Sequence, residues 1–546
     1  MTSPHGKLSD AHRPATLGTR GMVCSSHYLA SLAGIELLRA GGSAVDAAIG
    51  VAAVLGLVEP HMSGPGGDGY LMIRRGATGE VVCVNGTGPA PARATRELFA
   101  GTGIPYKGVR SVSVPGLVAG WVLAHEAHGA LPLERVFAPA CEIATEGFPL
   151  SAKVAESLAG EVAAGSPLVT FGPSAAIFAP RGRPLRAGEV CRNPDYAATL
   201  CEIARHGAEA FYRGPVGEAV LALSREQDGL FEAGDLRDLG ASRQQPIAST
   251  YRGWTVLEYP PNSSGHVLLQ ELNLLEHFDV KSMGLLSPDS IHVMVEAKKL
   301  AFADRERYLA DPDFVPIPLA RLISKEYAAE RVRLIDLERA APVCAPGELG
   351  EGDTTAFCTA DRWGNAVSQL QSLQSAWGSG LVVPGTGVLL NNRMTYWHLE
   401  ADHPDVLMPG KRVRHTMNPY MVLRDGHLVL VGGTPGADTQ VQTNMQVISH
   451  VLDFGLSVQE AVEAPRWRST QNRTESEYPH TCADELLLEG RFPEETRAAL
   501  LAKGHAVRII GDWAASGSQQ MIALDPDSGV MAGGSDPRRD GLALGW

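Results

Sequence analysis

The amino-acid sequence predicts an α+β fold with a helix-rich front part and a strand-rich back part. Before about residue 340, apolar residues mostly recur with the spacing of helix faces. After residue 352, short runs of strand-forming residues alternate with turn signals. Between the two parts, residues 340–352 are rich in proline, glycine and acidic residues and predict a loop. The 546 residues could fill several ordinary domains or one large unit.

The front part begins with two helices whose ends are marked in the sequence. The stretch SSHYLASLAGIELLRAGG offers a serine start, and its closing glycines predict the helix end. Ser43 opens an S-x-x-D capping pattern, which predicts a second helix over residues 44–58. A hairpin is expected at 70–84. Residues 111–335 are expected to be mainly helical, with a long amphipathic helix over 289–309.

The back part carries a series of strand signals and one helix signal, the latter near residues 444–453. A hairpin is predicted first, because a D-x-x-G-N turn joins the first two runs. The runs are TTAFCTA (354–360), NAVSQLQS (365–372), GVLL (387–390), YMVLR (420–424), HLVLVGG (427–433), QMIAL (520–524) and GVMAGG (529–534).

Composition excludes several classes of function. The formal net charge is −14 and no block of lysine and arginine occurs, which argues against a nucleic-acid partner. The N-terminus lacks the apolar core of a secretory signal, and no apolar run reaches the ~18 residues that span a bilayer. The eight cysteines are scattered without a C-x-x-C pair, so we expect no disulfides and no zinc site. A cytoplasmic protein is predicted.

Two short patterns resemble known motifs but have the wrong context. The glycines of GPGGDG (64–69) satisfy G-x-G-x-x-G, yet a helix precedes them and a strand follows, which is the reverse of a dinucleotide site. We interpret them as a tight turn that lets two backbones approach. HEAH (125–128) lacks the i, i+4 spacing of a zinc-binding histidine pair, and a solvated helix surface explains it better.

Thr354 is the one residue for which the sequence indicates chemistry. A threonine hydroxyl becomes a useful nucleophile when an adjacent base takes its proton. If the chain were cut between Asp353 and Thr354, the new α-amino group, with a pKa of ~7.7–8.0, would lie beside the hydroxyl. The alternative is an ordinary threonine-rich hairpin, since threonine favours strands. Taken alone, the Asp-Thr-Thr motif is better explained by that alternative.

A glycine-rich turn supplies a second element of the same chemistry. LVGGTPGADTQ (430–440) ends a strand in glycines, and successive N–H groups in such a turn can face an oxyanion. An ordinary turn explains the segment equally well.

Together these segments resemble the γ-glutamyltranspeptidase family of N-terminal nucleophile hydrolases, from about residue 21 to the C-terminus. The NNR pattern looks most like the oxamate amidohydrolase and acylase-like branch.

The resemblance implies a four-layer αββα sandwich. It also implies self-cleavage into a large subunit, 1–353, and a small subunit, 354–546, that form one intertwined unit. The matching segments follow the family's order: GMVCSSHYLASLAGIELLRAGGSAVDAAIGVAAVLGLVEPHMSGPGGDGYLMI, SVSVPGLVAGW, TTAFCTADRWGNAVS, GSGLVVPGTGVLLNNRM, PGKRVRHTMNPYMVLRDG, GTPGADTQ, DFGLSVQEAVEAPRW and SDPRRDG.

The resemblance assigns the catalytic positions. Thr354 matches the family's nucleophile, so cleavage is expected after Asp353, and Thr355 matches the second threonine of the pair. Ser372 stands where the family has a threonine that hydrogen-bonds the nucleophile, so a hydroxyl is kept.

Two further positions would form the oxyanion hole. Gly436 and Ala437 match the family's two glycines, and Ala437 still carries an N–H group. We therefore expect the hole to survive the substitution.

The substrate-contact positions depart from the family. Removing a bidentate guanidinium and a carboxylate partner deprives a glutamyl zwitterion of its main anchors, so γ-glutamyl donors should bind badly. Arg393 is new in the same run and predicts a pocket for an anionic or strongly polar acyl group, unless it is an outward-facing surface arginine. The departures are Thr87 for an arginine, Tyr396 for an acid, Gln374 for an asparagine, and His415 and Thr416 for two serines.

Three functions remain open from the sequence. The favoured one is an amidase or acylase for a small carboxylated amide, without metal or organic cofactor. The second is a γ-glutamyltransferase or glutathione hydrolase with altered glutamate recognition; a natural-product tailoring enzyme is a variant of either. The third is an unprocessed, non-catalytic binding protein. A homodimer of the processed unit is left open.

Overall fold

The computed structural model describes residues 11–341, 352–470, 480, 483 and 485–546, with only the backbone of residues 352 and 353. It contains two seven-stranded antiparallel sheets, a three-stranded sheet and a short two-stranded one. Most of the predicted loop at 340–352 lies outside the described residues. Among the described residues, no helix combines the length and the apolar character needed to cross a membrane.

The strands of the first large sheet come from both parts of the chain. Its order is β1 (Thr16–Gly18), β18 (Met531–Ser535), β17 (Gln520–Leu524), β13 (His427–Gly433), β12 (Tyr420–Arg424), β9 (Trp254–Glu258) and β8 (Ile247–Tyr251). The smaller sheets are β14 (Trp467–Ser469), β15 (Leu486–Glu489) and β16 (Val507–Ile510), and β5 (Phe148–Pro149) with β6 (Val190–Cys191).

The second large sheet contains the Asp-Thr-Thr motif near its centre. Strands β10 and β11 of the back part insert between β2 and β3 of the front part, so neither part completes the sheet alone. The order is β19 (Leu542–Gly545), β2 (Gly21–Ser25), β10 (Gly352–Asp361), β11 (Ala366–Ser375), β3 (Asp68–Arg74), β4 (Val81–Gly86) and β7 (Ser242–Gln244).

Alternating residues along the strands face different cores. On β3, Leu71 and Ile73 pack with one group of helices, while Tyr70 and Met72 pack with residues of the other large sheet.

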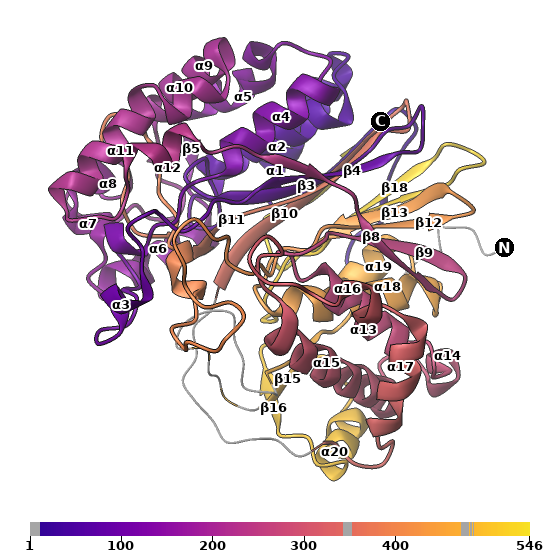
Figure 1. Cartoon of the computed structure of the whole chain (residues 1–546). Helices are drawn as coiled ribbons and strands as arrows, with labels where there is room; N and C mark the ends of the chain where they lie inside the picture. The colour runs from indigo at the N-terminus through magenta and orange to yellow at the C-terminus, as the bar shows by residue number, and fades with distance from the viewer. Residues whose placement is uncertain (1–10, 342–351, 471–479, 481–482, 484) are drawn as a thin grey trace.

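Figure 1 shows two groups of helices on opposite sides of the strands. The first group contains α1 (Tyr28–Arg39), α2 (Ala44–Val58), α4 (Leu117–His128), α5 (Leu133–Glu146), α9 (Pro194–His206) and α11 (Pro215–Glu226). The second contains α13 (Gly265–Leu275), α15 (Pro288–Tyr308), α18 (Thr439–Leu452), α19 (Val458–Glu463) and α20 (Glu494–Ala502).

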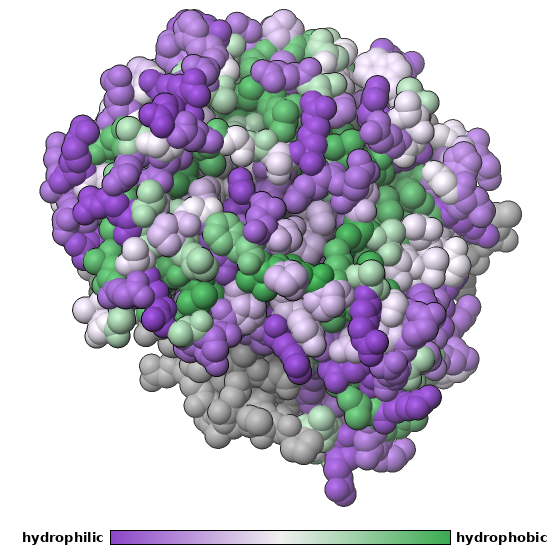
Figure 2. Space-filling model, viewed as in Figure 1, coloured by the Kyte–Doolittle hydropathy of each residue, from purple (hydrophilic) through white to green (hydrophobic). Residues whose placement is uncertain are grey.

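The remaining α-helices of the described residues connect these elements. They are α3 (Arg96–Phe99), α6 (Ala152–Ala163), α7 (Pro167–Thr170), α8 (Gly172–Phe178), α10 (Ala208–Tyr212), α12 (Ala233–Arg237), α14 (Val280–Met283), α16 (Leu319–Leu322) and α17 (Lys325–Arg331). On the face shown in Figure 2, hydrophilic side chains cover the outer helices, and apolar ones lie among them toward the middle.

Several predicted boundaries are confirmed and others are wrong. The capping box at Ser43 forms as predicted and opens α2. The cap of α1 is His27, whose ring accepts from Leu29 N at 3.3 Å, and not a serine hydroxyl. The mainly helical stretch 111–335 also contains strands β7, β8 and β9. GVLL (387–390) forms only isolated bridges, because it turns to meet Gly66 and Val382.

A buried cluster of charges ties β15 to the chain after β18. Glu489 accepts from Arg538 Nε at 2.7 Å and from Arg538 Nη2 at 2.6 Å, and Arg491 Nη2 adds a third contact at 2.7 Å. Asp536 lies 3.1 Å from Arg538 and is also paired with Arg466. The Glu489 side chain is fully buried. Removing one member would leave the other charges buried without compensation.

We therefore expect Glu489→Ala to lower the free energy of unfolding by about 3–5 kcal/mol, measured by urea denaturation. The matched control is Glu209→Ala. Glu209 also pairs with an arginine, Arg213, but its side chain is 69% exposed, and its loss should cost less than about 1 kcal/mol. Equal effects of the two substitutions would show that the buried cluster does not stabilise the fold.

Candidate active site

Thr354 lies at an irregularity in a central strand. The register between β10 and β11 shifts between Asp353 and Thr355, so Thr354 is the single residue of β10 that opposes Ser372 and Leu373 of β11 in a β-bulge, a feature common beside active sites. Its Oγ1 donates to Ser372 Oγ at 3.3 Å, and Thr354 is only 3% exposed. Gln374 N donates to the same Ser372 oxygen at 2.8 Å. The structure thus brings together the nucleophile candidate and the hydroxyl that the sequence paired with it.

Thr355 points to a second polar group. Its Oγ1 lies 2.9 Å from Glu59 Oε2 and 2.7 Å from Ser26 Oγ, and Ser26 also donates to Glu59. All three side chains are buried. Glu59 therefore holds the residue next to Thr354 through hydrogen bonds to a carboxylate, which are stronger than neutral ones. The sequence did not indicate Ser26 or Glu59, because neither belongs to a spacing motif.

The neighbouring strand contributes a buried acid. Ser372 pairs across the ladder with Asp68 of β3, the aspartate of the GPGGDG stretch. Asp68 Oδ2 accepts from Arg393 Nε at 3.0 Å and lies 3.7 Å from His415 Nε2, while Oδ1 accepts from Gly88 N at 3.1 Å. Although burial tends to raise the pKa of Asp68, His415 and Arg393 together lower it. The sequence missed Asp68, because its motif was interpreted only as a turn.

Arg393 faces inward, so its interpretation as an outward-facing surface residue is wrong. It is 1% exposed, and its guanidinium carbon lies 4.7 Å from the centre of the Tyr396 ring. Burial lowers the pKa of His415 to about 4, and the charge of Arg393 adds to this effect, so His415 is neutral at pH 7. With Asp68 ionised, the group formed by Asp68, Arg393 and His415 carries no net charge.

Several buried polar atoms of Arg393, His415 and two further predicted contact residues have no hydrogen-bond partner among the described residues. They are Arg393 Nη2, His415 Nε2, Thr416 Oγ1 and Gln374 Nε2. Buried polar atoms are normally satisfied, so each of these atoms keeps capacity for a further hydrogen bond. Gln374 also has a φ of +89°, which is strained for a residue with a side chain.

The other predicted contact residues lie around the same group with partners of their own. Thr87 donates to Asn85 Oδ1 from its hydroxyl at 2.7 Å, and its carbonyl accepts from Arg412 Nε at 3.1 Å. Arg414 is directed away from Arg393, since it binds Glu306 at 2.9 Å.

The predicted glycine turn follows β13 and precedes α18. Gly436 and Ala437 have φ values of +121° and +47°, and their carbonyls accept from the first turn of the helix. Among the described residues, no hydrogen bond from either N–H group is found. Both groups lie at the N-terminal end of a 14-residue helix, where the helix dipole favours negative charge. Ser368 Oγ of β11 donates to Gly432 O at 2.8 Å and holds the preceding strand against β11.

The turn lines a cavity of about 380 Å³. Its wall is rich in cations and also contains Glu156 and Ser157. Ser157 Oγ accepts from Trp377 Nε1 at 3.0 Å, just beyond the end of β11. The cationic lining residues are Lys153, Arg468, Arg538 and Arg539. The sequence did not indicate these cations, because they come from three distant segments.

The glycine turn after α2 allows close backbone approach, as predicted. A Cβ on Gly66 would lie 2.2 Å from Leu389 O, and one on Gly67 would lie 2.2 Å from Ser372 O. Side chains are therefore excluded directly beside Ser372. Among the described residues, two groups of histidine and carboxylate side chains could hold a metal ion, and neither includes a residue of this site.

Comparisons of the whole chain with known proteins show its family. The model of the gamma-glutamyltranspeptidase family matches residues 30–546. The glutathione hydrolase-like YwrD proenzyme of Bacillus subtilis (strain 168) is 36% identical over 97% of this chain and 99% of its own length. The oxamate amidohydrolase proenzyme of Klebsiella pneumoniae is 33% identical over 97% and 99%. The crystal structure of cephalosporin acylase from Bacillus halodurans matches with a TM-score of 0.90 and 35% identity, covering 100% of this chain and 99% of its own. The chain belongs to the gamma-glutamyltranspeptidase family.

Proposed function

We propose that the chain is a self-processing amidohydrolase whose nucleophile is the N-terminal threonine created by cleavage. The observation that carries this proposal is the placement of Thr354, in a strand bulge 3.3 Å from the Ser372 hydroxyl. The N–H groups of the Gly436–Ala437 turn supply the oxyanion donors. Relatives named as proenzymes support a processing step.

Self-cleavage begins when Thr354 Oγ1 attacks the carbonyl carbon of Asp353. The peptide C–N bond breaks as the C–O bond forms, which converts the amide into an ester and frees the Thr354 amine. Water then hydrolyses the ester and leaves a carboxylate on Asp353. The free amine, with a pKa of ~7.7–8.0, can accept the hydroxyl proton in the next reaction.

Substrate hydrolysis uses the same atoms. Thr354 Oγ1 attacks the substrate amide, and its proton passes through the Thr354 amine to the leaving nitrogen. The N–H groups of Gly436 and Ala437 stabilise the tetrahedral oxyanion, and loss of one such donor typically costs ~10²–10³ in kcat. Water resolves the acyl-enzyme and releases an acid.

The two chains would remain interlocked after cleavage. Residues 1–353 form the large subunit and 354–546 the small one, and each contributes strands to both large sheets. We infer that they form the four-layer αββα sandwich of N-terminal nucleophile hydrolases. Support comes from the strand faces, which alternate between helix cores and a shared inter-sheet core.

We infer a substrate that is a small amide with a carboxylate. The unpartnered Nη2 of Arg393 can donate to an anionic or polar acyl group. Asp68 neutralises Arg393, so the pocket binds anions by directed hydrogen bonds more than by net charge. Thr87 and Tyr396 offer neither the guanidinium nor the carboxylate that would hold a glutamyl zwitterion.

The processing step predicts two chains. Purified wild type should give chains of 353 and 193 residues by intact mass, and Thr354→Ala should remain a single chain of 546. Thr354→Ser is the matched control, because it keeps a hydroxyl and should still cleave. An uncut wild type that stays intact for days would instead indicate a non-catalytic binding protein, and a cut Thr354→Ala would exclude Thr354 as the nucleophile.

Glu59 is expected to position the Thr354–Thr355 pair. Glu59→Gln keeps one acceptor oxygen but removes the charge, and we expect self-cleavage to slow about tenfold, equivalent to ~1.4 kcal/mol. The rate is measured by gel densitometry of freshly made protein. Glu36→Gln, on the exposed face of α1, is the control. If both variants cleave at the wild-type rate, Glu59 has no part in processing.

Arg393 is expected to determine preference for a carboxylate. Arg393→Ala should raise KM about 10–100-fold for an amide whose acyl group carries a carboxylate, with a smaller effect on the uncharged analogue, since one to two charge-assisted hydrogen bonds are lost. General destabilisation would affect both substrates equally. An unchanged KM would refute the role of Arg393. Efficient turnover of γ-glutamyl-p-nitroanilide by wild type would favour a γ-glutamyl enzyme instead.

A further inference from the structure

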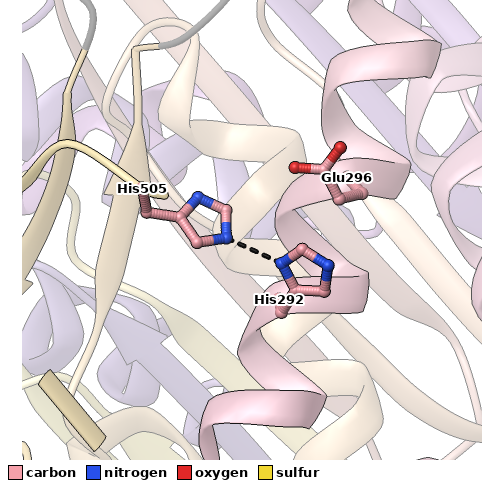
Figure 3. A group of neighbouring side chains, drawn as sticks. All are labelled: His292, Glu296 and His505. Carbon is pink, nitrogen blue, oxygen red and sulfur yellow. Dashed lines mark hydrogen bonds between the residues drawn. The ribbon is translucent and has the colours of Figure 1, made fainter. Parts of the chain in front are cut away.

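A second cluster of reactive side chains lies on the small-sheet side of the molecule. His292 and Glu296 lie one turn apart on α15, and Figure 3 shows both on the side of the helix that faces His505. His292 Nδ1 and His505 Nε2 are 2.8 Å apart. One ligand atom of each residue lies within 4.8 Å of the others, and all three residues are buried.

The orientation of His292 is set by a backbone carbonyl. Its Nε2 donates to Asp336 O at 2.7 Å, which leaves the lone pair of Nδ1 directed at His505. Metal-binding histidines are commonly oriented by such a contact from the other ring nitrogen.

The carboxylate of the cluster is fixed at the same time. Glu296 Oε1 accepts from Lys299 Nζ at 2.6 Å, and Oε2 accepts from Ala341 N at 3.1 Å. Each carboxylate oxygen has two lone pairs, so both oxygens keep acceptor capacity. A cavity of about 710 Å³ lies next to the cluster: none of the three residues lines it, but Asp336, whose carbonyl binds His292, and Gly504, which precedes His505, do.

We propose that His292, Glu296 and His505 form a binding site for a divalent transition-metal ion, with Zn²⁺ the best match. Two imidazole nitrogens and one carboxylate are a ligand set that zinc accepts, and the adjoining cavity can supply water as the fourth ligand. Zinc–nitrogen bonds of about 2.0–2.1 Å in tetrahedral geometry require the two nitrogens to be roughly 3.3 Å apart. The two nitrogens, which are 2.8 Å apart in the hydrogen-bonded pair, would have to move apart to admit the ion.

The site would join the two sides of the proposed cleavage point. His292 and Glu296 precede the Asp353–Thr354 bond and His505 follows it. The chain before the proposed cleavage point is also held by Lys503, whose carbonyl accepts from Ala340 N at 2.8 Å. This bridging role rests on the proposed function, whereas the metal site itself does not.

The competing arrangement is a neutral hydrogen-bonded pair, in which His505 Nε2–H donates to His292 Nδ1. The second histidine and carboxylate group of the structure carries no such proposal. Its Glu306 is held by two arginines, Arg305 at 2.8 Å and Arg414 at 2.9 Å, whereas Glu296 is held by one lysine, so more positive charge opposes a metal ion there.

The site can be tested with protein that carries no histidine tag. After chelation and reloading with Zn²⁺, elemental analysis should give about one ion per chain, and Tm should rise by several degrees with Zn²⁺ but not with Mg²⁺. His505→Gln and Glu296→Gln should lose the ion. His206→Gln, on an exposed helix surface, should keep it. Equal zinc content in His505→Gln and wild type would overturn the proposal.

A measurement on wild type avoids dependence on variants that fold poorly. Loading with Co²⁺ should produce the visible absorption bands of a tetrahedral site, and Zn²⁺ should abolish them. No bands, no bound zinc and no change in Tm would establish the neutral pair instead.

The bridging role has a separate readout. Chelation should lower the Tm of cleaved wild type more than that of uncut Thr354→Ala, because only the cleaved form lacks a covalent link between the ligands. Metal binding in both proteins with equal shifts in Tm would refute bridging. If wild type itself stays uncut, the processing proposal fails and the metal site stands.

Discussion

The insertion of β10 and β11 between β2 and β3 is the constraint on which the rest of the structure depends. This pairing places Thr354 in a bulge near the centre of a sheet whose other strands come mainly from the front part of the chain. Both faces of the sheet are covered, so the nucleophile candidate can move little. The same ladder sets Ser372 beside Thr354 and Asp68 beside Ser372, and so determines the order of the site across three strands.

Burial of charge shapes the site around this ladder. Asp68 and Arg393 are buried together, and each would be costly alone. Burial and the charge of Arg393 keep His415 neutral, and individual donor atoms are left without partners. This group offers directed hydrogen bonds with no net charge, whereas cations line the cavity beside the Gly436–Ala437 turn. Specificity in such a site depends on where a ligand places its polar atoms.

The fold was predictable where local signals agreed with burial. The capping box of Ser43 and the alternating strands β12 and β13 formed as expected, because their hydrophobic pattern and their turns favour the same structure. The strands β7, β8 and β9 were missed, since they are short, partly exposed and flanked by helices. β8 and β9 pair with each other in a local hairpin, whereas β9 also pairs with β12 and β7 pairs with β4, and no local period reveals those distant partners.

The sequence by itself determined the identity and order of the chemical groups: a threonine after an acidic residue, a hydroxyl 18 residues later, a glycine turn, and an arginine in a run where the family has none. Only the tertiary structure decided what these groups face. The contacts of Glu59 with Thr355, of Asp68 with Arg393 and of His505 with His292 join residues that lie 296, 325 and 213 positions apart. They depend on sheet register and helix packing. Both arise from the burial of many side chains at once, so no single stretch of the chain predicts them.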